Sequence, residues 1–202
     1  EYGNRYQWRA SKPYELVIKL PQERLLKLQR TGVMPRGTQL RYAEIRALVA
    51  GVTAIQGVND PQDTPTPEPL VRHIDRWIFG QHRARTMLDL PTTSSADADT
   101  LKTYLADDNV DAFYLHLCEG KRGDNISGQE FQRFVDFGVD IAKTIIIHGT
   151  ALDHDQIQHV AQAGCKLVWS PQSNLRLYGE TTLAVDAIQA GMPLALGAAL
   201  SR

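Results

Sequence analysis

The sequence predicts an α/β fold with a parallel sheet, and two observations support this. First, four apolar runs of strand length occur in the second half of the chain: DAFYLHLCEG (111–120), TIIIHGTAL (144–152), KLVWSPQSN (166–174) and MPLALGAAL (192–200). Second, amphipathic segments separate these runs, so the order from residue 111 onward is strand, helix, strand, helix, strand, helix, strand. Parallel strands require crossover connections of this kind, usually helical, which is why the alternation favours a parallel sheet.

Polar residues stand at the ends of three of the four runs. The ends are marked by His116, His148, Ser170 and Ala199, which lie 32, 22 and 29 residues apart. Each interval is about the length of a strand, a covering helix and two loops. In a parallel barrel, the C-terminal ends of successive strands face one shared mouth, where such barrels keep their active sites. We therefore expect residues that are distant in the sequence to converge at one mouth.

The first half of the chain is less regular. Its expected elements are a loop over 1–14, a helix over 15–30, a helix over 39–50, a strand over 51–58, a Pro-rich loop over 59–69, a short helix over 70–79 and a strand over 84–90. Pro21 suits the start of the main helix in the first of these segments, and Gly51 suits the end of the second helix. The sequence thus predicts six strands, two fewer than a closed (β/α)8 barrel needs.

The second half adds helices between its strands. They are expected over 100–106, 128–140, 153–164 and 181–191. Asp153 or Asp155 is the expected N-cap of the third helix, and Gly164 is its expected stop. The segment SPQSN (170–174) is interpreted as a Pro-containing turn.

Composition excludes several classes of function. A chain of 202 residues can bury a sizeable core as one domain. Its net charge of −1 gives no electrostatic reason to expect nucleic acid or an anionic membrane as partner. No apolar stretch reaches the ~18 residues of a membrane span. Cys118 and Cys165 lie in apolar runs without paired spacing, which predicts buried, reduced thiols and favours the cytoplasm.

His116 and Glu119 follow a His-x-x-Glu spacing at the end of a strand. Imidazole at such a place can be a zinc ligand, and a carboxylate three residues later can act as general base or acid. A hydrogen-bonded histidine beside a surface glutamate is the alternative interpretation. His148 directly follows three isoleucines, so its side chain is expected either in a site or as a hydrogen-bonded residue of the core.

Other polar residues carry weaker signals. Ser170 and Asn174 either face a site or bond only to nearby backbone, as short polar side chains in turns often do. The remaining histidines, which are His73, His82, His154 and His159, are interpreted as surface residues. Neither a Gly-rich phosphate loop nor a Gly-x-Ser-x-Gly nucleophile elbow occurs in the chain.

Five short motifs, taken jointly, resemble the metal-dependent amidohydrolase superfamily. They are GVTAIQG, HLCEG, IIHGTAL, LVWSPQSNLRLYGETT and GMPLALGA, in this order. The resemblance covers residues 40–199, and the most similar branch contains chlorohydrolases and deaminases of cytosine or S-adenosylhomocysteine. It implies a partial, distorted (β/α)8 barrel over residues 1–202 that includes about the second to eighth strands and lacks the first.

The resemblance also implies roles for single residues. His116 would be a metal ligand, Glu119 the carboxylate that shuttles a proton, and His148 the histidine that polarises the substrate or touches the metal. Ser170 to Asn174 would form a wall of the substrate pocket. The family hydrolyses C–N or C–halogen bonds of small molecules with a water bound to one divalent metal ion, zinc or iron. No organic cofactor is implied.

This chain departs from the family pattern at two places. The family's His-x-His pair of the first strand is absent, and the Asp expected after GMPLALGA is Ala199. Catalytic zinc sites typically use three protein ligands, so we expect metal binding to be weak or absent. Both ends look cut, which favours a fragment of a longer enzyme; a non-catalytic relic, scaffold or binding protein is the alternative. Unpaired strand edges predict aggregation unless the chain forms a homo-oligomer.

Overall fold

The fold was determined as a computed structural model of the 202-residue chain. It describes all residues except 36, 53, 56–69, 75–83, 93–95 and 199–202. The chain divides into two compact units: the larger contains Glu1–Trp8 and Arg85–Arg202, and the smaller contains Arg9–Ala84. The expectation of one domain over residues 1–202 stays a prediction.

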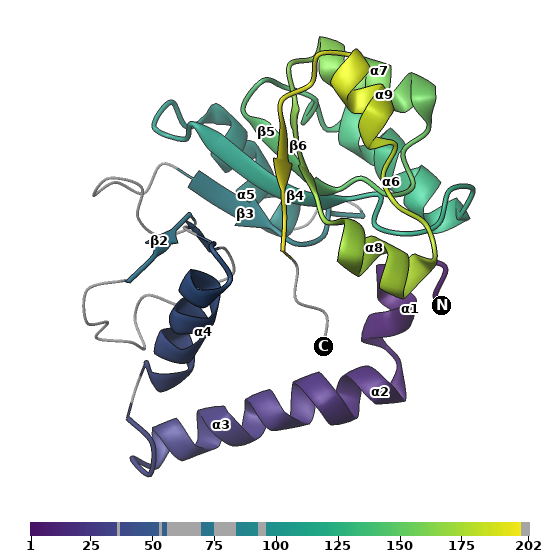
Figure 1. The fold of residues 1–202 in the computed structure, drawn as a ribbon. Helices are drawn as coiled ribbons and strands as arrows, with labels where there is room; N and C mark the ends of the chain where they lie inside the picture. The colour runs from purple at the N-terminus through teal and green to yellow at the C-terminus, as the bar shows by residue number, and fades with distance from the viewer. Residues whose placement is uncertain (36, 53, 56–69, 75–83, 93–95, 199–202) are drawn as a thin grey trace. The chain divides into compact units, whose positions relative to one another are not determined.

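The larger unit is built on a five-stranded sheet (Figure 1). Its strands, in spatial order, are β3 (Ala84–Met87), β4 (Ala112–Leu117), β5 (Thr144–His148), β6 (Lys166–Trp169) and β7 (Leu194–Leu196). The pairs β4–β5, β5–β6 and β6–β7 are parallel. A doubly wound sheet reverses its strand order at a switch point, whereas this sheet keeps the chain order throughout, as the wall of a (β/α)8 barrel does. The predicted α/β fold with a parallel sheet is confirmed.

Helices connect the strands of the larger unit. They are α5 (Ala96–Ala106), α6 (Asn125–Asp136), α7 (His154–Gln162), α8 (Pro171–Tyr178) and α9 (Ala184–Gln189). Asp153 caps α7 and forms a capping box with Gln156, as the predicted N-cap requires. The predicted turn at 170–174 is wrong, because Pro171 occupies the first turn of α8, where its missing N–H costs nothing. Gly179, at φ 73°, ends this helix.

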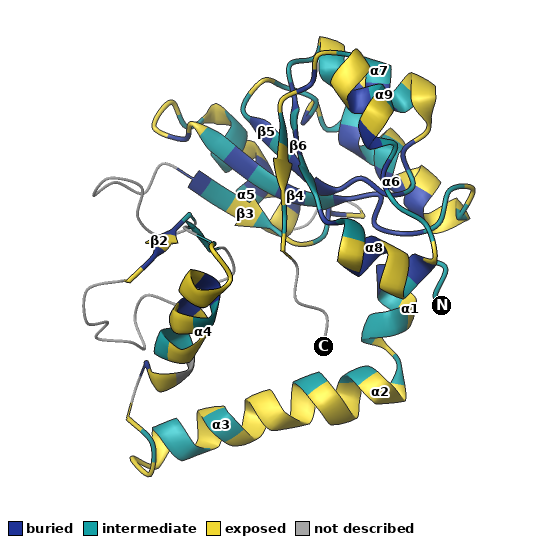
Figure 2. Cartoon of the chain, in the orientation of Figure 1, coloured by how far each residue is buried: buried dark blue, intermediate teal, exposed yellow. Residues whose placement is uncertain are grey.

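The alternation of side chains along β4 separates the core from the opposite face of the sheet. Phe113, Leu115 and Leu117 are all 0% exposed, whereas Tyr114 and His116 are half-buried. Successive side chains of a strand point to opposite faces, so His116 lies on the face opposite the main core. The core itself packs β4 to β6 against the helices and includes Leu101, Phe134, Ile146, Ile157, Val160 and Leu167. Figure 2 shows this concentration of buried residues in the sheet and the inner helix faces.

The first eight residues belong to the larger unit. The loop predicted over residues 1–14 is wrong for Arg5–Arg9 and Lys12–Tyr14, which are helical. Helix α1 (Arg5–Arg9) begins here, and Asn4 forms an antiparallel bridge with Gly120 just beyond β4. The Arg5 amide donates to the Glu119 carbonyl at 3.0 Å. The N-terminal segment is therefore fixed to the end of β4 by backbone hydrogen bonds that the local pattern of residues 1–14 does not reveal.

The smaller unit combines helices with a two-stranded parallel sheet. Its elements are α2 (Lys12–Tyr14), the π-helical turn η1 (Glu15–Lys19), α3 (Leu20–Arg30), α4 (Thr38–Val49), β1 (Ala54–Ile55) and β2 (Arg72–His73). Pro21 lies in the first turn of α3, and Gly51 follows α4 at φ 76°, both as predicted. The helix predicted over 70–79 is wrong where the structure describes it, because β2 pairs there with β1; residues 75–79 lie outside the described part.

A buried contact between a histidine and a glutamate joins β2 to α4 in the smaller unit. His73 is 3% exposed and Glu44 is 1% exposed, and His73 Nε2 lies 2.8 Å from Glu44 Oε1. The same oxygen accepts a hydrogen bond from the Leu70 amide at 2.9 Å. The prediction of His73 as a surface residue is wrong because its partner lies 29 residues earlier, on α4. His82 lies outside the described residues.

Both cysteines are free and buried, as predicted. Burial raises the pKa of Cys165 to about 12 and that of Cys118 well above its ordinary value.

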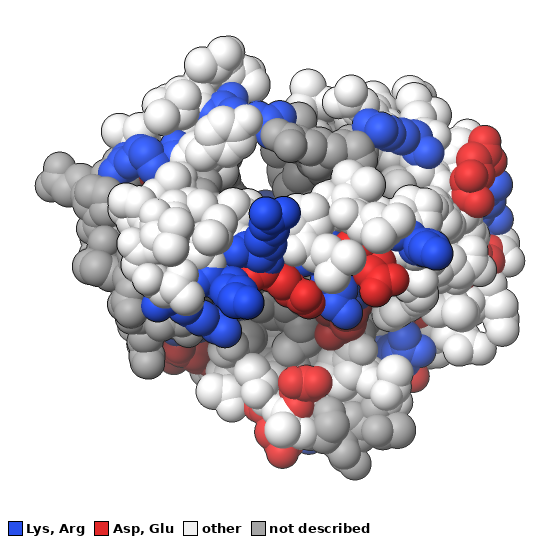
Figure 3. Space-filling view, turned by 90° about the horizontal axis from the view of Figure 1, so that it is seen from below, with Lys and Arg blue, Asp and Glu red and all other residues white. Residues whose placement is uncertain are grey.

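Among the described residues, no helix combines the length and apolar character needed to cross a membrane. Basic and acidic side chains both occur on the face in Figure 3, in keeping with the net charge of −1. The absence of a nucleic-acid or membrane partner stays a prediction.

Candidate functional site

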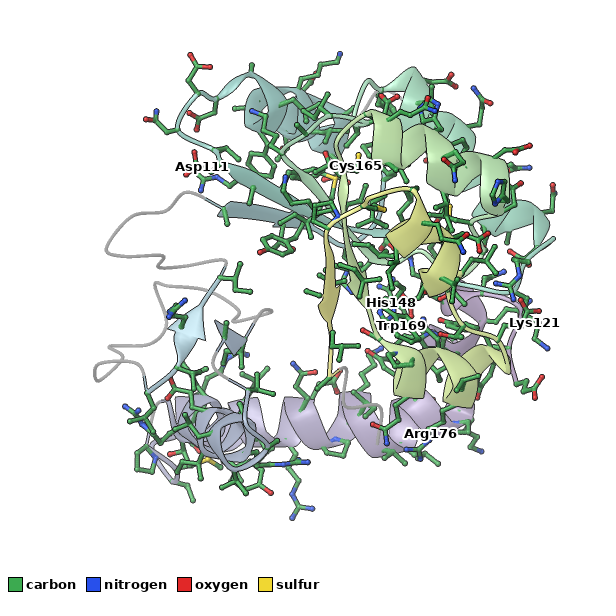
Figure 4. The ribbon with its side chains drawn as sticks, turned by 45° about the horizontal axis from the view of Figure 1, so that its top comes forward. Asp111, Lys121, His148, Cys165, Trp169 and Arg176 are labelled. Atoms are coloured by element: carbon green, nitrogen blue, oxygen red, sulfur yellow. The ribbon has the colours of Figure 1, made fainter. Side chains whose placement is uncertain are left out.

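Two neighbouring strands bring two histidines together. In the parallel register of β4 and β5, His116 stands opposite Ile147, and Leu117 stands opposite His148. The two imidazole rings lie 5.4 Å apart between centroids. Figure 4 shows His148 near Trp169 at one end of the sheet and Cys165 at the opposite end. The histidines therefore occupy the C-terminal ends of the strands, the end that carries the active sites of parallel barrels.

Glu119 completes a cluster with these histidines. One potential ligand atom from each of His116, Glu119 and His148 lies within 4.8 Å of the others. Glu119 and His148 are both 4% exposed, and His148 Nε2 lies 3.7 Å from Glu119 Oε1. Two ligands of a tetrahedral zinc ion, each about 2.1 Å from the metal, lie about 3.4 Å apart. The donor types suit a divalent metal ion, and the His148–Glu119 separation is close to that spacing, but donor atoms up to 4.8 Å apart would have to move closer together to share one ion.

A closed hydrogen-bond network orients His148. Its Nδ1 lies 2.8 Å from Asn174 Oδ1, and Asn174 Nδ2 donates to Thr182 Oγ1 at 3.1 Å. The Thr182 hydroxyl donates its single proton to the His148 carbonyl at 2.6 Å. Thr182 must therefore accept from the Asn174 amide nitrogen, which turns the Asn174 oxygen toward His148. In neutral His148, this network places the proton on Nδ1 and leaves the Nε2 lone pair facing Glu119.

The backbone is strained where β4 and β5 end. Cys118 and His148 have φ values of 49° and 69°, a region that residues other than glycine rarely adopt. The Cys118 amide donates to buried Glu130 Oε2 at 2.9 Å, and the Ala151 amide donates to the Cys118 carbonyl at 2.8 Å. Strain of this kind gathers at functional sites, where the surrounding structure enforces it. It turns the chain sharply after each strand.

Glu119 is held by two further side chains that sequence reasoning did not select. The Tyr178 hydroxyl donates to Glu119 Oε1 at 2.8 Å, and Trp8 Nε1 donates to the Tyr178 oxygen at 2.7 Å. Burial and the neighbouring Glu119 charge raise the pKa of Tyr178 far above its ordinary value. The only signal for Tyr178 in the sequence is its place eight residues after Ser170, within the motif that follows β6.

The side chain of a buried arginine also contacts the C-terminal end of β4. Arg5 is 1% exposed, and its guanidinium contacts Glu130 Oε1 at 2.8 Å and Asp89 Oδ1 at 2.8 Å. It also donates to the His116 carbonyl at 3.2 Å. Burial opposes the charge on Arg5, but the neighbouring carboxylates outweigh burial and raise its pKa. Tyr6 donates to Glu130 Oε1 at 2.8 Å, and burial, with Glu130, raises the pKa of Tyr6 to about 12.

The remaining predicted site residues lie in different surroundings. Ser170 is 2% exposed and precedes α8 without capping it through its side chain. Asn174 is 0% exposed and its amide is committed to His148 and Thr182. Ala199 lies outside the described residues. His154 and His159 are surface residues, as predicted, each paired with an aspartate.

A cavity of about 430 Å³ lies away from this cluster. It is formed by the loops after β4 and β5 and by the first turns of α6 and α7, and its lining includes Arg122, Asp124, Gln129 and Gln156. None of His116, Glu119 and His148 lines it. Among the described residues, the titratable groups that could bind a metal or move a proton converge in the histidine–glutamate cluster, and not in this cavity.

Comparison with known proteins gave no match to a family model and none to a curated protein. Among solved structures, a triazine hydrolase from Arthrobacter aurescens is 15% identical with a TM-score of 0.48, over 66% of this chain and 28% of that one. A zinc-bound adenosine deaminase from Xanthomonas campestris is 21% identical with a TM-score of 0.49, over 69% of this chain and 29% of that one.

An amidohydrolase from Brucella melitensis is 21% identical with a TM-score of 0.44, over 56% of this chain and 26% of that one. The matched parts thus span less than a third of each of these proteins. At TM-scores below 0.5, these similarities assign neither a family nor an activity, so a function for this chain depends on the geometry of its own cluster.

Proposed function

We propose that this chain carries part of the active site of an amidohydrolase-like enzyme that hydrolyses a non-peptide C–N bond of a small molecule, as deaminases and related aminohydrolases do. The observation that carries the proposal is the convergence of His116, Glu119 and His148 within 4.8 Å at the C-terminal ends of neighbouring strands. The five sequence motifs described above support the choice of reaction class. The activity of the 202-residue chain alone is expected to be low or absent.

His116 and His148 are the residues that would hold a divalent metal ion, zinc or iron. Such an ion supplies Lewis-acid chemistry and makes water a better nucleophile near neutral pH. The Nε2 lone pair of His148 is available for this role because the Asn174 oxygen accepts a hydrogen bond from Nδ1–H, which keeps the ring proton on Nδ1. Glu119, 3.7 Å from His148 Nε2, accepts a proton from the nucleophile and returns it to the leaving amine.

The roles of Ser170 and Asn174 differ in this proposal. Asn174 acts through His148, because its amide oxygen and nitrogen are both used inside the buried network. Ser170 stands at the start of α8, directly after β6, and remains the candidate for contact with the substrate. A residue in this position shapes the pocket wall without taking part in proton transfer.

The metal is expected to bind weakly. If Glu119 is reserved for proton transfer, two imidazoles remain as ligands, one fewer than catalytic zinc sites typically use. The sequence contains no His-x-His pair to supply more. The same observation favours a second candidate function, a non-catalytic scaffold or binding protein that keeps the fold.

The test is a titration of the metal-free chain with zinc, in which calorimetry measures binding. Metal analysis of the purified protein gives the number of bound ions. We expect weak binding at ~one ion per chain, lost in His116→Ala. His159→Ala is the matched control, since His159 is an exposed histidine paired with Asp140 outside the cluster.

The outcomes separate the two candidates. Zinc binding that depends on His116 but not on His159 supports the enzyme proposal and justifies assays on aminated heterocycles. A chain that folds but binds no zinc at millimolar concentration supports the scaffold. Binding that His116→Ala leaves unchanged refutes the proposed site.

A further inference from the structure

We propose that Tyr178 and Trp8 are positioning residues for Glu119, and that the N-terminal segment Gly3–Trp8 holds both the side chain and the backbone of this glutamate. The significance of the arrangement for proton transfer rests on the proposed function. The contacts themselves do not, because they involve neither a metal nor a substrate.

The hydrogen bonds in this relay have a fixed direction. An indole N–H can only donate, so Trp8 Nε1 donates to the Tyr178 oxygen across 2.7 Å. The single proton of the Tyr178 hydroxyl is then directed at Glu119 Oε1, 2.8 Å away. Tyr178 therefore serves as a donor to the carboxylate, and Trp8 polarises that hydroxyl in the same direction.

Burial makes this relay effective. Tyr178 is 0% exposed and Glu119 is 4% exposed, so little water competes for the carboxylate. Hydrogen bonds to an ionised acceptor are shorter and stronger than neutral ones. Because one carboxylate oxygen accepts the hydrogen bond from Tyr178, turning the carboxylate out of its plane would break this bond. The relay thus fixes the plane of the carboxylate and leaves its second oxygen directed elsewhere.

The same N-terminal segment also fixes the backbone of Glu119. The Arg5 amide donates to the Glu119 carbonyl at 3.0 Å, and the Lys121 amide donates to the Gly3 carbonyl at 2.7 Å. Gly120 lies between these bonds, and a Cβ built there would lie 2.6 Å from the Gly3 carbonyl oxygen. The close approach therefore depends on glycine at position 120, and it places Trp8 within reach of Tyr178.

The test uses Tyr178→Phe and Trp8→Phe, each of which removes one polar group and keeps an aromatic ring. The Glu119 carboxylate band is identified by isotope-edited infrared spectroscopy as the band that Glu119→Gln removes. We expect Tyr178→Phe to shift the antisymmetric stretch of this band to higher wavenumber, because the carboxylate loses a donor. Trp8→Phe is expected to produce a smaller shift in the same direction.

Two matched controls test whether a general loosening of the fold could cause the shift of the Glu119 band. Tyr6→Phe removes a tyrosine hydroxyl that donates to a different buried carboxylate, Glu130, also at 2.8 Å. Trp169→Phe removes an indole donor that bonds to Thr181 Oγ1 at 2.7 Å. Neither control is expected to move the Glu119 band.

An unchanged Glu119 band in Tyr178→Phe overturns the inference, and so does an equal shift in Tyr6→Phe. If Tyr178→Phe does not fold, Trp8→Phe decides the matter alone, and an unmoved band in a folded Trp8→Phe chain counts against the relay. Metal-free chain is used throughout, so a failed zinc titration would refute the proposed function without affecting this result.

Discussion

Replacing Asn174 by leucine tests whether Asn174 fixes the tautomer of His148. Leucine has the branched shape of asparagine, with a larger volume, but can neither accept from His148 Nδ1 nor donate to Thr182. In the native chain the Asn174 oxygen lies 2.8 Å from His148 Nδ1, and the group is fully buried. The substitution therefore removes the hydrogen bond at Nδ1 of His148, while Glu119 remains 3.7 Å from Nε2.

The expected magnitude follows from burial. A buried polar group that loses its partner costs about 1–3 kcal/mol. In the native chain, the alternative tautomer of His148 would leave the Asn174 oxygen facing a bare Nδ1, so the Nδ1–H tautomer is favoured by about 5-fold to 150-fold. Asn174→Leu removes this preference, and the free energy of unfolding falls by about 1–3 kcal/mol.

The assay is long-range ¹H–¹⁵N correlation NMR on histidine-labelled chain at pH ~8, above the ordinary histidine pKa of about 6.5. Native His148 is expected to show a protonated Nδ1 and an unprotonated Nε2, whereas the variant shows a mixture. His159, on the surface, is the internal control and keeps its signals in both chains. A native spectrum with the proton on His148 Nε2 would refute the reasoning.

Three further predictions concern stability and reactivity. Arg5→Met leaves Glu130 as a buried, unpaired carboxylate and is expected to destabilise the larger unit by about 3–5 kcal/mol in urea unfolding; a loss below about 1 kcal/mol would contradict the buried pair. Cys165, with its pKa raised to about 12 by burial, is expected to resist iodoacetamide at pH ~8 until denaturant is added, and rapid alkylation of the folded chain would show that it is accessible. The hydrogen bond that His154 donates to the Asp186 carboxylate raises the pKa of His154, so this pair stabilises the fold fully below pH ~6.5 and loses its effect as pH rises through the folded pKa. Thermal midpoints of native chain and Asp186→Asn should therefore converge as pH rises, and a gap that is constant with pH would contradict the pairing.

The sequence predicts the part of the site that depends on strand ends. His116 and His148 each close an apolar run, and the C-terminal ends of adjacent parallel strands necessarily meet. Once the alternation of strands and helices is recognised, the proximity of these two histidines follows from the register of β4 and β5. Glu119 follows as well, because it lies three residues beyond His116.

The supporting residues are not predictable in this way. Trp8 and Tyr178 are separated by 170 residues, and Arg5 and Glu130 by 125 residues. Local periodicity describes contacts along one helix or strand, whereas these pairs depend on how the chain returns to the end of β4. A charged residue such as Glu130 on an amphipathic helix is expected at the surface, but Arg5 and Tyr6, both from the N-terminal segment, pair with it and compensate its burial.

Tertiary pairing also explains the errors in secondary structure. Residues 70–74 carry a weak helical pattern, but the Ile74 amide donates to the Ile55 carbonyl at 2.9 Å, which extends the pairing of two short strands. The turn expected at 170–174 became helix α8. Pro171 is compatible with both structures, since proline suits a turn and the first turn of a helix equally.

Strain and buried polarity occur at the same two positions, and this coincidence supports a functional interpretation. Left-handed backbone at Cys118 and His148 costs on the order of 1–3 kcal/mol each. Each position is also held by a buried side chain from elsewhere: Glu130 accepts from the Cys118 amide, and Thr182 donates to the His148 carbonyl. A fold selected for stability alone would place glycine at both positions, where it removes the strain. At position 148, glycine would also remove the imidazole. A histidine that retains the strained backbone, together with an asparagine that fixes its tautomer, is what a site needs when it keeps one nitrogen lone pair directed at a buried carboxylate.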